Sequence, residues 1–249
     1  GAVAWYQGEA DQSGTAYAAY LASLSALAED YRSQFKTAHG AGFDPVIITW
    51  QLCEGTTMSH VAGVPKAQLD WSNRCSFGYC FGPTYHIERQ AADGTHFSSD
   101  GYRHLGAYAA LVFKRVVIDR VGWEPLQPVS ETVVGNSIVL TFNKRGLVFD
   151  TTILPAQTNF GFTVENGSGT PQTISSVEIV GDNRVRITCA STPASGWTVK
   201  YGHQAMSGVT SWLYTGPGGN LRDSAGDYLT YDAISQPMHN WCSLSKMEL

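Results

Sequence analysis

The sequence changes its pattern near residue 126, and this change limits what the chain can fold into more than any other feature. Before it, apolar runs alternate with segments whose apolar residues recur every three or four positions. That pattern predicts strands alternating with amphipathic helices. After it, short segments alternate apolar and polar residues and are separated by Gly, Asn, Asp and Pro, which predicts antiparallel strands. We therefore expect two domains, residues 1–125 and 126–249.

The first half predicts an α/β unit. Its apolar run at 45–52 is β-branched and nearly uninterrupted, as expected for a parallel strand covered on both faces. Strand and helix alternate along this half, so we expect a three-layer α/β/α parallel sheet with its site at the carboxyl ends of the strands. The expected elements are strands at 1–6, 45–52 and 75–81, and helices at 15–37, 66–71 and from a Ser98 or Ser99 cap to 116.

The second half predicts an antiparallel β-sandwich. Alternating segments of this length, separated by turn residues, are typical of two packed antiparallel sheets. The expected strands are residues 137–142, 160–164, 176–180, 184–188 and 197–201.

Composition narrows the function. Charged residues make up 15% of the 249 positions and the net charge is -5, which argues against nucleic acid as a partner because phosphates need clustered Lys and Arg. No run approaches the roughly 18 apolar residues of a membrane span. Five cysteines at irregular spacing establish neither a disulfide framework nor a zinc site. Cys75 and Cys80 could pair or stay thiols, and we favour thiols.

The residues from Asp93 to Tyr102 read DGTHFSSDGY. An acid three residues before a histidine, on a glycine-containing loop that opens a helix, can hold one imidazole nitrogen while the other faces a substrate. Alone, such a pair is more often a helix cap or a structural hydrogen bond. Gln7 ends the first apolar run, so we expect it at the same edge of the sheet as His96.

Two blocks together, WYQGEAD from Trp5 to Asp11 and the block that contains His96, resemble the SGNH hydrolases, specifically the sialate O-acetylesterase-like carbohydrate esterases. The resemblance covers about residues 1–120. Segments 219–224 and 239–242 resemble the β-sandwich domains that follow such esterases, including those on phage tail spikes. The resemblance implies an SGNH-type fold and a serine-dependent carbohydrate O-acetylesterase that uses neither a metal nor another cofactor.

Carried over by position, the resemblance implies that His96 is the general base, that Asp93 orients it, and that the side-chain amide of Gln7 donates to the oxyanion. Glu9 and Trp5 are the expected substrate-binding residues, with Glu9 more a brace of its turn than a reacting group. In this family the nucleophilic serine lies upstream of the Gln-Gly-Glu strand, so we expect it on a segment of the same protein that precedes Gly1. Ser13 lies after the wrong block and is interpreted as a loop or helix-cap serine.

The expected substrate is an acetylated glycan or polysaccharide, acted on in an extracellular or virion-associated location, and a phage fibre would suggest a homotrimer. The alternative is a glycan-binding or structural module of a viral fibre with a vestigial esterase half. Trp197, Trp212 and Trp241 could line a sugar-binding face, although core packing is the preferred interpretation. A glycosidase ranks last, because no distant acid opposes Glu9 and Asp11.

Five further histidines have no ligand-like spacing with a second His, Cys or carboxylate. We interpret them as structural or surface residues and expect no metal site. They are His60, His86, His104, His203 and His239.

Overall fold

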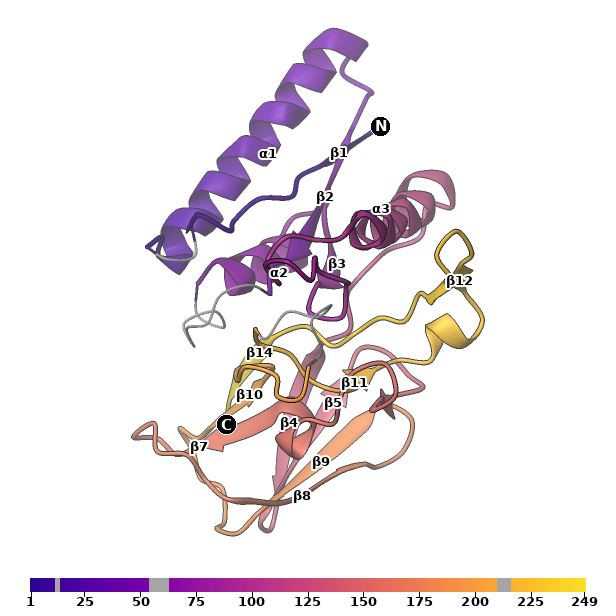
Figure 1. Ribbon diagram of the computed structural model, residues 1–249. Helices are drawn as coiled ribbons and strands as arrows, with labels where there is room; N and C mark the ends of the chain where they lie inside the picture. The colour runs from indigo at the N-terminus through magenta and orange to yellow at the C-terminus, as the bar shows by residue number, and fades with distance from the viewer. Residues whose placement is uncertain (12–13, 54–62, 210–215) are drawn as a thin grey trace.

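The computed structural model describes residues 1–11, 14–53, 63–209 and 216–249. It shows a mixed α/β fold in which a three-stranded parallel sheet is followed by sheets that are antiparallel. The helices gather around the first sheet, and the rest of the chain is mainly strands and loops (Figure 1).

The parallel sheet has the order β1-β2-β3, and its strands are β1 (Ala2–Ala4), β2 (Val46–Gln51) and β3 (Gly78–Pro83). Ile47 lies between Val3 of β1 and Gly78 of β3. Every residue of β2 after the first is buried, which confirms the expected parallel strand covered on both faces. β1 is shorter than the expected strand 1–6, and β3 lies two or three residues later than expected.

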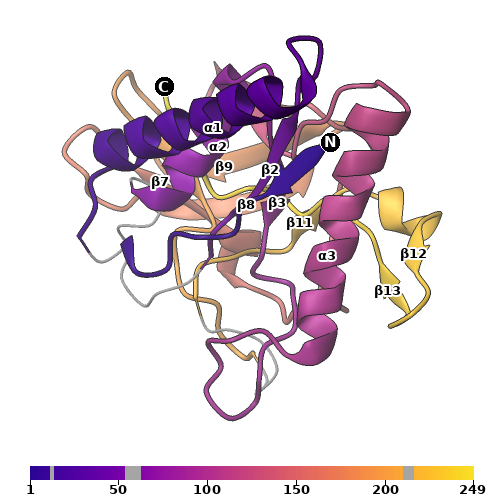
Figure 2. The same cartoon turned by 90° about the horizontal axis from the view of Figure 1, so that it is seen from above.

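Three α-helices cover this sheet, with α1 and α2 on one side and α3 on the other (Figure 2). Helical spacing predicted α1 and α3, and a short helix at 66–71 was expected within a less regular stretch. α2 is longer than that at both ends, and it begins earlier because Pro65 is well placed in a first helical turn. Ser98, one of the two expected caps, accepts a hydrogen bond from the Gly101 backbone N–H at 2.9 Å. The helices are α1 (Tyr17–His39), α2 (Val64–Arg74) and α3 (Ser99–Phe113), which continues as a π-helical turn at Lys114–Ile118.

Two antiparallel sheets dominate the second half, and each of the five expected strands is present in them. The four-stranded sheet has the order β4-β5-β9-β8 and the three-stranded sheet the order β14-β10-β7. Their strands are β4 (Pro128–Val134), β5 (Ser137–Phe142), β7 (Phe162–Glu165), β8 (Ile174–Ile179), β9 (Arg184–Cys189), β10 (Thr198–Tyr201) and β14 (Ser245–Glu248).

The edge strands β4 and β14 and the short ladders were not predicted from the sequence. β4 lies at a sheet edge with most of its residues exposed, so it lacks the alternation that marks a half-buried strand. The short ladders pair β6 (Val148–Phe149) with β11 (Leu221–Arg222), and β12 (Thr230–Tyr231) with β13 (Gln236–Pro237). Two short 3-10 turns occur at Thr158–Gly161 and Ala225–Asp227.

Three clusters of buried apolar side chains form the core. The first lies around the parallel sheet and includes residues from Tyr20 to Trp123 together with Met238 of the second half. The second begins at Leu126 and contains residues of both larger antiparallel sheets. The third joins Cys53 and Tyr85 of the first half to residues of the second half such as Leu244. The buried clusters therefore change close to residue 126, while a shared cluster links the two halves.

The C-terminal segment returns to the first half and is held there by buried hydrogen bonds. The side chain of Gln51, at the end of β2, donates to the Leu244 carbonyl at 2.9 Å and accepts from the Leu244 N–H at 2.7 Å. The Tyr85 hydroxyl donates to the Cys242 carbonyl at 2.8 Å. At this place the two halves are joined by side-chain hydrogen bonds to the backbone of the C-terminal segment.

All five cysteines are free thiols, which confirms the expectation for Cys75 and Cys80. Within the described ranges, no helix combines the length and the apolar character needed to cross a membrane.

Candidate functional site

The Asp93 carboxylate and the His96 imidazole form a direct hydrogen bond on the loop between β3 and α3. Their Oδ2 and Nδ1 atoms are 2.7 Å apart. The other carboxylate oxygen accepts from the backbone N–H groups of Thr95 at 2.8 Å and His96 at 3.0 Å. Gly94 has φ +64°, a conformation that favours glycine and lets the loop fold back on the acid. The loop therefore holds both oxygens of Asp93.

The protonation of this pair follows from its geometry. The His96 side chain, and then the two backbone N–H groups, lower the pKa of Asp93 to about 2. An ionised carboxylate can only accept hydrogen bonds, so Nδ1 of His96 carries the proton. In the neutral ring Nε2 is then the basic nitrogen, as a general base requires.

Neighbouring residues hold the loop in place. Arg89 is 1% exposed, and its guanidinium lies 3.6 Å from the centre of the Phe97 ring while donating to the Thr95 carbonyl at 2.7 Å. The backbone N–H of Gln90 donates to the His96 carbonyl at 2.7 Å. The position of the imidazole is therefore set by contacts to the backbone of its own residue and of the residue before it.

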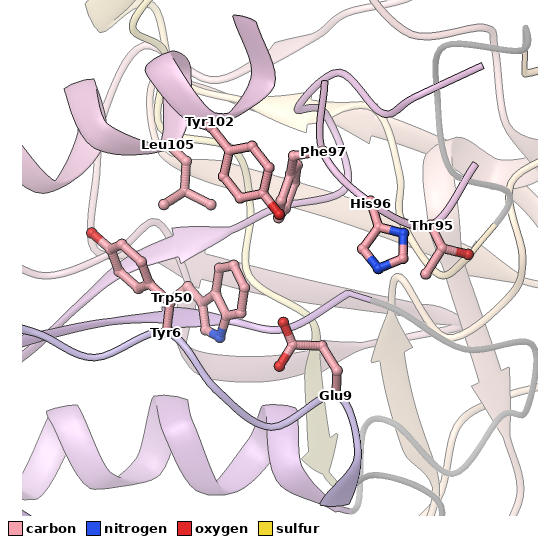
Figure 3. Close-up of a pocket in the computed structure, with 8 residues that line it drawn as sticks. All are labelled: Tyr6, Glu9, Trp50, Thr95, His96, Phe97, Tyr102 and Leu105. Atoms are coloured by element: carbon pink, nitrogen blue, oxygen red, sulfur yellow. The ribbon is translucent and has the colours of Figure 1, made fainter. Parts of the chain in front are cut away.

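His96 opens onto a pocket of about 360 Å³. Figure 3 shows the His96 ring and the Glu9 carboxylate at one end of this pocket, with its aromatic side chains grouped to one side of them. The His96 side chain is 68% exposed, so solvent and substrate can reach it. The lining residues are Tyr6, Glu9, Trp50, Thr95, His96, Phe97, Tyr102 and Leu105.

The aromatic side chains of this pocket pack against one another. Ring centres are 5.3 Å apart for Tyr6 and Trp50, 5.8 Å for Trp50 and Phe97, and 5.5 Å for Phe97 and Tyr102. Such a wall offers an apolar aromatic surface to an acyl group or to the C–H face of a sugar. These four residues were not predicted as site residues, although Tyr6 and Trp50 lie at the carboxyl ends of adjacent strands and could have been found from that position.

Gln7 does not line this pocket. Its side-chain N–H donates to the Asp11 carboxylate, and its Oε1 lies 3.2 Å from the Tyr20 hydroxyl. Its backbone carbonyl accepts from the same hydroxyl and from Gln68 Nε2, each at 2.9 Å. The structure therefore places Gln7 in a hydrogen-bond network at the end of β1, and its oxyanion role stays a prediction.

Trp5 also lies away from the pocket lining. Its ring packs against the first core cluster, with its centre 6.4 Å from that of Tyr31 on α1. Of the five expected site residues, His96 and Glu9 line the pocket, and Asp93 lies behind His96 through the hydrogen bond to its Nδ1.

The other residues that the sequence singled out divide between the core and the undescribed positions. Trp241 is 2% exposed and Trp197 packs on the second core cluster, which favours core packing for both. Ser13, His60 and Trp212 lie outside the described residues. Among the described residues, no group of three or more His, Cys, Asp or Glu side chains is arranged to hold a metal ion.

Comparison with known proteins gives one informative likeness. No protein-family model matches the chain, and no curated protein does. A carbohydrate acetylesterase from Xanthomonas citri has a similar structure, with a TM-score of 0.63 and 15% identity over 99% of this chain. The chain spans 50% of the length of that protein. At this identity the likeness shows a shared esterase-like α/β fold.

A second solved structure is much less similar. It is the N-terminal part of the bacterial S-layer protein SbsC, with a TM-score of 0.30 and 14% identity, covering 92% of this chain and 37% of that one. A score this low carries no argument about fold or function.

Proposed function

We propose that this chain is part of a serine-dependent carbohydrate O-acetylesterase of the SGNH type. The observation that carries the proposal is the Asp93–His96 hydrogen bond of 2.7 Å at the edge of a solvent-open aromatic pocket. The similar fold of a carbohydrate acetylesterase supports the same class of reaction. The substrate we propose is an acetylated glycan or polysaccharide.

In the proposed reaction, a serine hydroxyl from a preceding segment of the same protein attacks the acetyl carbonyl. His96 Nε2 takes the serine proton as the C–O bond forms, and the ionised Asp93 stabilises the imidazolium. The tetrahedral intermediate then expels the sugar alkoxide, which takes the proton from His96. Water repeats these steps on the acetyl-serine and releases acetate.

The negative charge on the tetrahedral intermediate needs a hydrogen-bond donor. Gln7 Nε2 carries two N–H groups, and one of them donates to Asp11. We propose that the second N–H group donates to the oxyanion. One such donor stabilises the transition state by about 3 to 4 kcal/mol. Glu9, at the same pocket, is proposed to accept a hydrogen bond from a sugar hydroxyl.

Acetate release tests this function. The chain is expressed with its preceding segment and incubated with an acetylated polysaccharide or an aryl acetate. His96→Ala should lose turnover by at least about 1,000-fold while its circular dichroism stays unchanged. His39→Ala, at an exposed position on α1, should behave like the wild type.

Unchanged turnover in a folded His96→Ala variant would remove the assignment. If the wild-type protein releases no acetate but binds the polysaccharide, the glycan-binding alternative becomes the better account.

A further inference from the structure

The turn that follows β1 carries two of the expected site residues. Gln7 and Glu9 stand on either side of Gly8 in this turn. A hydrogen bond from the Asp11 N–H to the Gly8 carbonyl, at 3.1 Å, closes it. In Figure 3 the Glu9 side chain extends from the turn towards the pocket. The position of this backbone therefore decides where the Gln7 amide and the Glu9 carboxylate lie.

The Gln7 carbonyl, at the start of the turn, accepts hydrogen bonds from three side chains. The Tyr20 hydroxyl of α1 and the Gln68 amide of α2 donate to it, each at 2.9 Å. The Trp50 indole N–H of β2 is a longer donor, at 3.4 Å. Because the three donors come from three elements, the carbonyl is held by α1, α2 and β2 together.

Gln68 is held in one orientation by its other contacts. Its side chain is fully buried, and its Oε1 accepts from the Leu52 backbone N–H at 2.8 Å. A backbone N–H can only donate, so the end of the amide that faces Leu52 must be the oxygen. Nε2 then faces the turn, where it donates to the Gln7 carbonyl and lies 3.3 Å from the Tyr20 hydroxyl. Both ends of the amide are therefore engaged.

Gly8 packs directly against α2. It is buried and has φ +138°, a conformation that favours glycine. A Cβ at this position would lie 2.8 Å from Val64 Cγ1 and 3.1 Å from Gln68 Nε2. No side chain separates the backbone of the turn from Gln68, so a change at Gln68 acts on the turn directly.

Gln68 contacts the turn but lies behind it as seen from the pocket. Among the described residues, those that line the pocket include Glu9 and Trp50 but not Gln68. An effect of Gln68 on the reaction must therefore pass through the turn. We infer that Gln68 is a positioning residue, which fixes the turn from which Gln7 and Glu9 act on the substrate. The inference rests on the proposed function, because that proposal gives these two residues their roles.

Two variants release the turn, and a third is their control. Gln68→Met keeps the length of the side chain and removes its hydrogen bonds. Tyr20→Phe removes another donor to the Gln7 carbonyl and provides the same test if Gln68→Met does not fold. Tyr17→Phe is the matched control, because the Tyr17 hydroxyl also joins α1 to α2 but binds Asp70, at 2.7 Å.

The position of the turn is measured by the ¹H–¹⁵N resonance of the Trp50 indole, assigned by its loss in Trp50→Phe. This N–H donates to the Gln7 carbonyl, so its chemical shift reports a movement of that carbonyl. Gln68→Met and Tyr20→Phe should each shift the resonance, whereas Tyr17→Phe should leave it unchanged. The measurement requires no catalytic activity.

Acetate release from an aryl acetate by the longer protein is the second readout. Gln68→Met should lower kcat by about 10- to 100-fold, because a donor displaced by about 1 Å no longer meets the oxyanion. In a Gln7→Ala background the same substitution should change kcat by less than about twofold, since the amide that it positions is absent. Tyr17→Phe should keep the kcat of the wild type.

Two results would overturn the inference. One is an unchanged Trp50 resonance in folded Gln68→Met, and the other is a kcat that falls by the same factor with and without the Gln7 amide, as a purely structural role predicts. A wild-type protein that releases no acetate would instead remove the proposed function. The Trp50 resonance would still show whether Gln68 fixes the turn, so the two proposals fail separately.

Discussion

At the scale of single residues, the two oxygens of the Asp93 carboxylate have different roles. One accepts two backbone N–H groups and shapes the loop, and the other holds His96 Nδ1. Asparagine in its place can keep the first set of bonds but presents an N–H₂ group to the ring. The loop should therefore survive while the tautomer of His96 changes.

Asp93→Asn should lower kcat for acetate release by about 10³- to 10⁴-fold with little change in stability. Steady-state kinetics and urea unfolding check the two parts. Asp100→Asn is the matched control, because Asp100 is exposed and pairs with Arg103 at 3.2 Å. Equal kinetics in the two variants would contradict the role proposed for Asp93.

Gln7 can be tested against its structural surroundings. If its amide donates to the oxyanion, Gln7→Ala should lower kcat by about 10²- to 10³-fold. If it only joins Asp11 to Tyr20, the same variant should lose stability and keep kcat. Kinetics together with urea unfolding midpoints decide between these results.

At the scale of elements, α3 depends on one close approach. A Cβ at Gly101 would lie 2.1 Å from the Glu88 carbonyl oxygen, whereas a Cβ at Gly106 would meet nothing within 4 Å. Both glycines belong to α3. The first turn of the helix is thus fitted closely against the segment that leads into the His96 loop.

Gly101→Ala should destabilise the protein by about 1 to 3 kcal/mol, because backbone must move to admit the methyl group. Gly106→Ala should stabilise it by about 0.5 to 1 kcal/mol, through better helix propensity. Urea unfolding of the two variants is the measurement. A neutral Gly101→Ala would show that α3 and the Glu88 segment are not in close contact.

At the scale of the whole molecule, Gln51 couples the two halves. It is 0% exposed, and both ends of its amide bond to the Leu244 backbone. Gln51→Leu has a similar volume but leaves a buried N–H and a buried carbonyl unpaired. We expect the free energy of unfolding to fall by about 2 to 4 kcal/mol. The wild-type protein should unfold in a single transition.

Urea unfolding followed by tryptophan fluorescence and by circular dichroism checks this coupling. Gln34→Leu, on the exposed face of α1, is the control and should change stability by less than about 0.5 kcal/mol. Two separate transitions in the wild-type protein would show that the halves unfold independently.

The buried histidines predict how stability depends on pH. Burial lowers the pKa of His104 to about 4 and that of His86 well below its ordinary value. Between about pH 6.5 and 4 the unfolded chain therefore binds protons that the folded chain does not. The free energy of unfolding is therefore highest above about pH 6.5. It falls by about 1.4 kcal/mol per pH unit for each histidine as the pH drops from 6.5 towards 4.

Acidic groups act in a lower window, so the effect can be assigned. The pKa of Asp93 and that of Asp44 are lowered to about 2 by their hydrogen bonds to His96 and Arg32. The stability that these two ionised carboxylates give to the folded protein is lost only as the pH falls below about 4. The urea concentration at the unfolding midpoint should fall as the pH is lowered from 7 to 4.5 in the wild type. It should fall less steeply in His104→Gln. A flat wild-type profile would contradict the burial of these rings.

The local sequence pattern was sufficient to predict much of the fold and part of the candidate site. Helical spacing predicted α1 and α3, the β-branched run predicted β2, and alternation predicted β5, β7, β8, β9 and β10 of the two larger antiparallel sheets. The Asp93–His96 pair was also predictable, because its members lie three residues apart on one loop. In each case the information lies within one element or one turn.

What the sequence by itself determined is therefore local: which segments are helix or strand, and that an acid can reach a histidine three residues later. Tertiary structure alone decided that the Gln7 carbonyl accepts from Tyr20 and Gln68, that Tyr6 and Trp50 line the His96 pocket, and that Leu244 pairs with Gln51. The physical reason is that periodicity records only which side of an element is buried. Contacts between residues as far apart as Gln51 and Leu244 depend on how whole elements pack, and no local pattern encodes them.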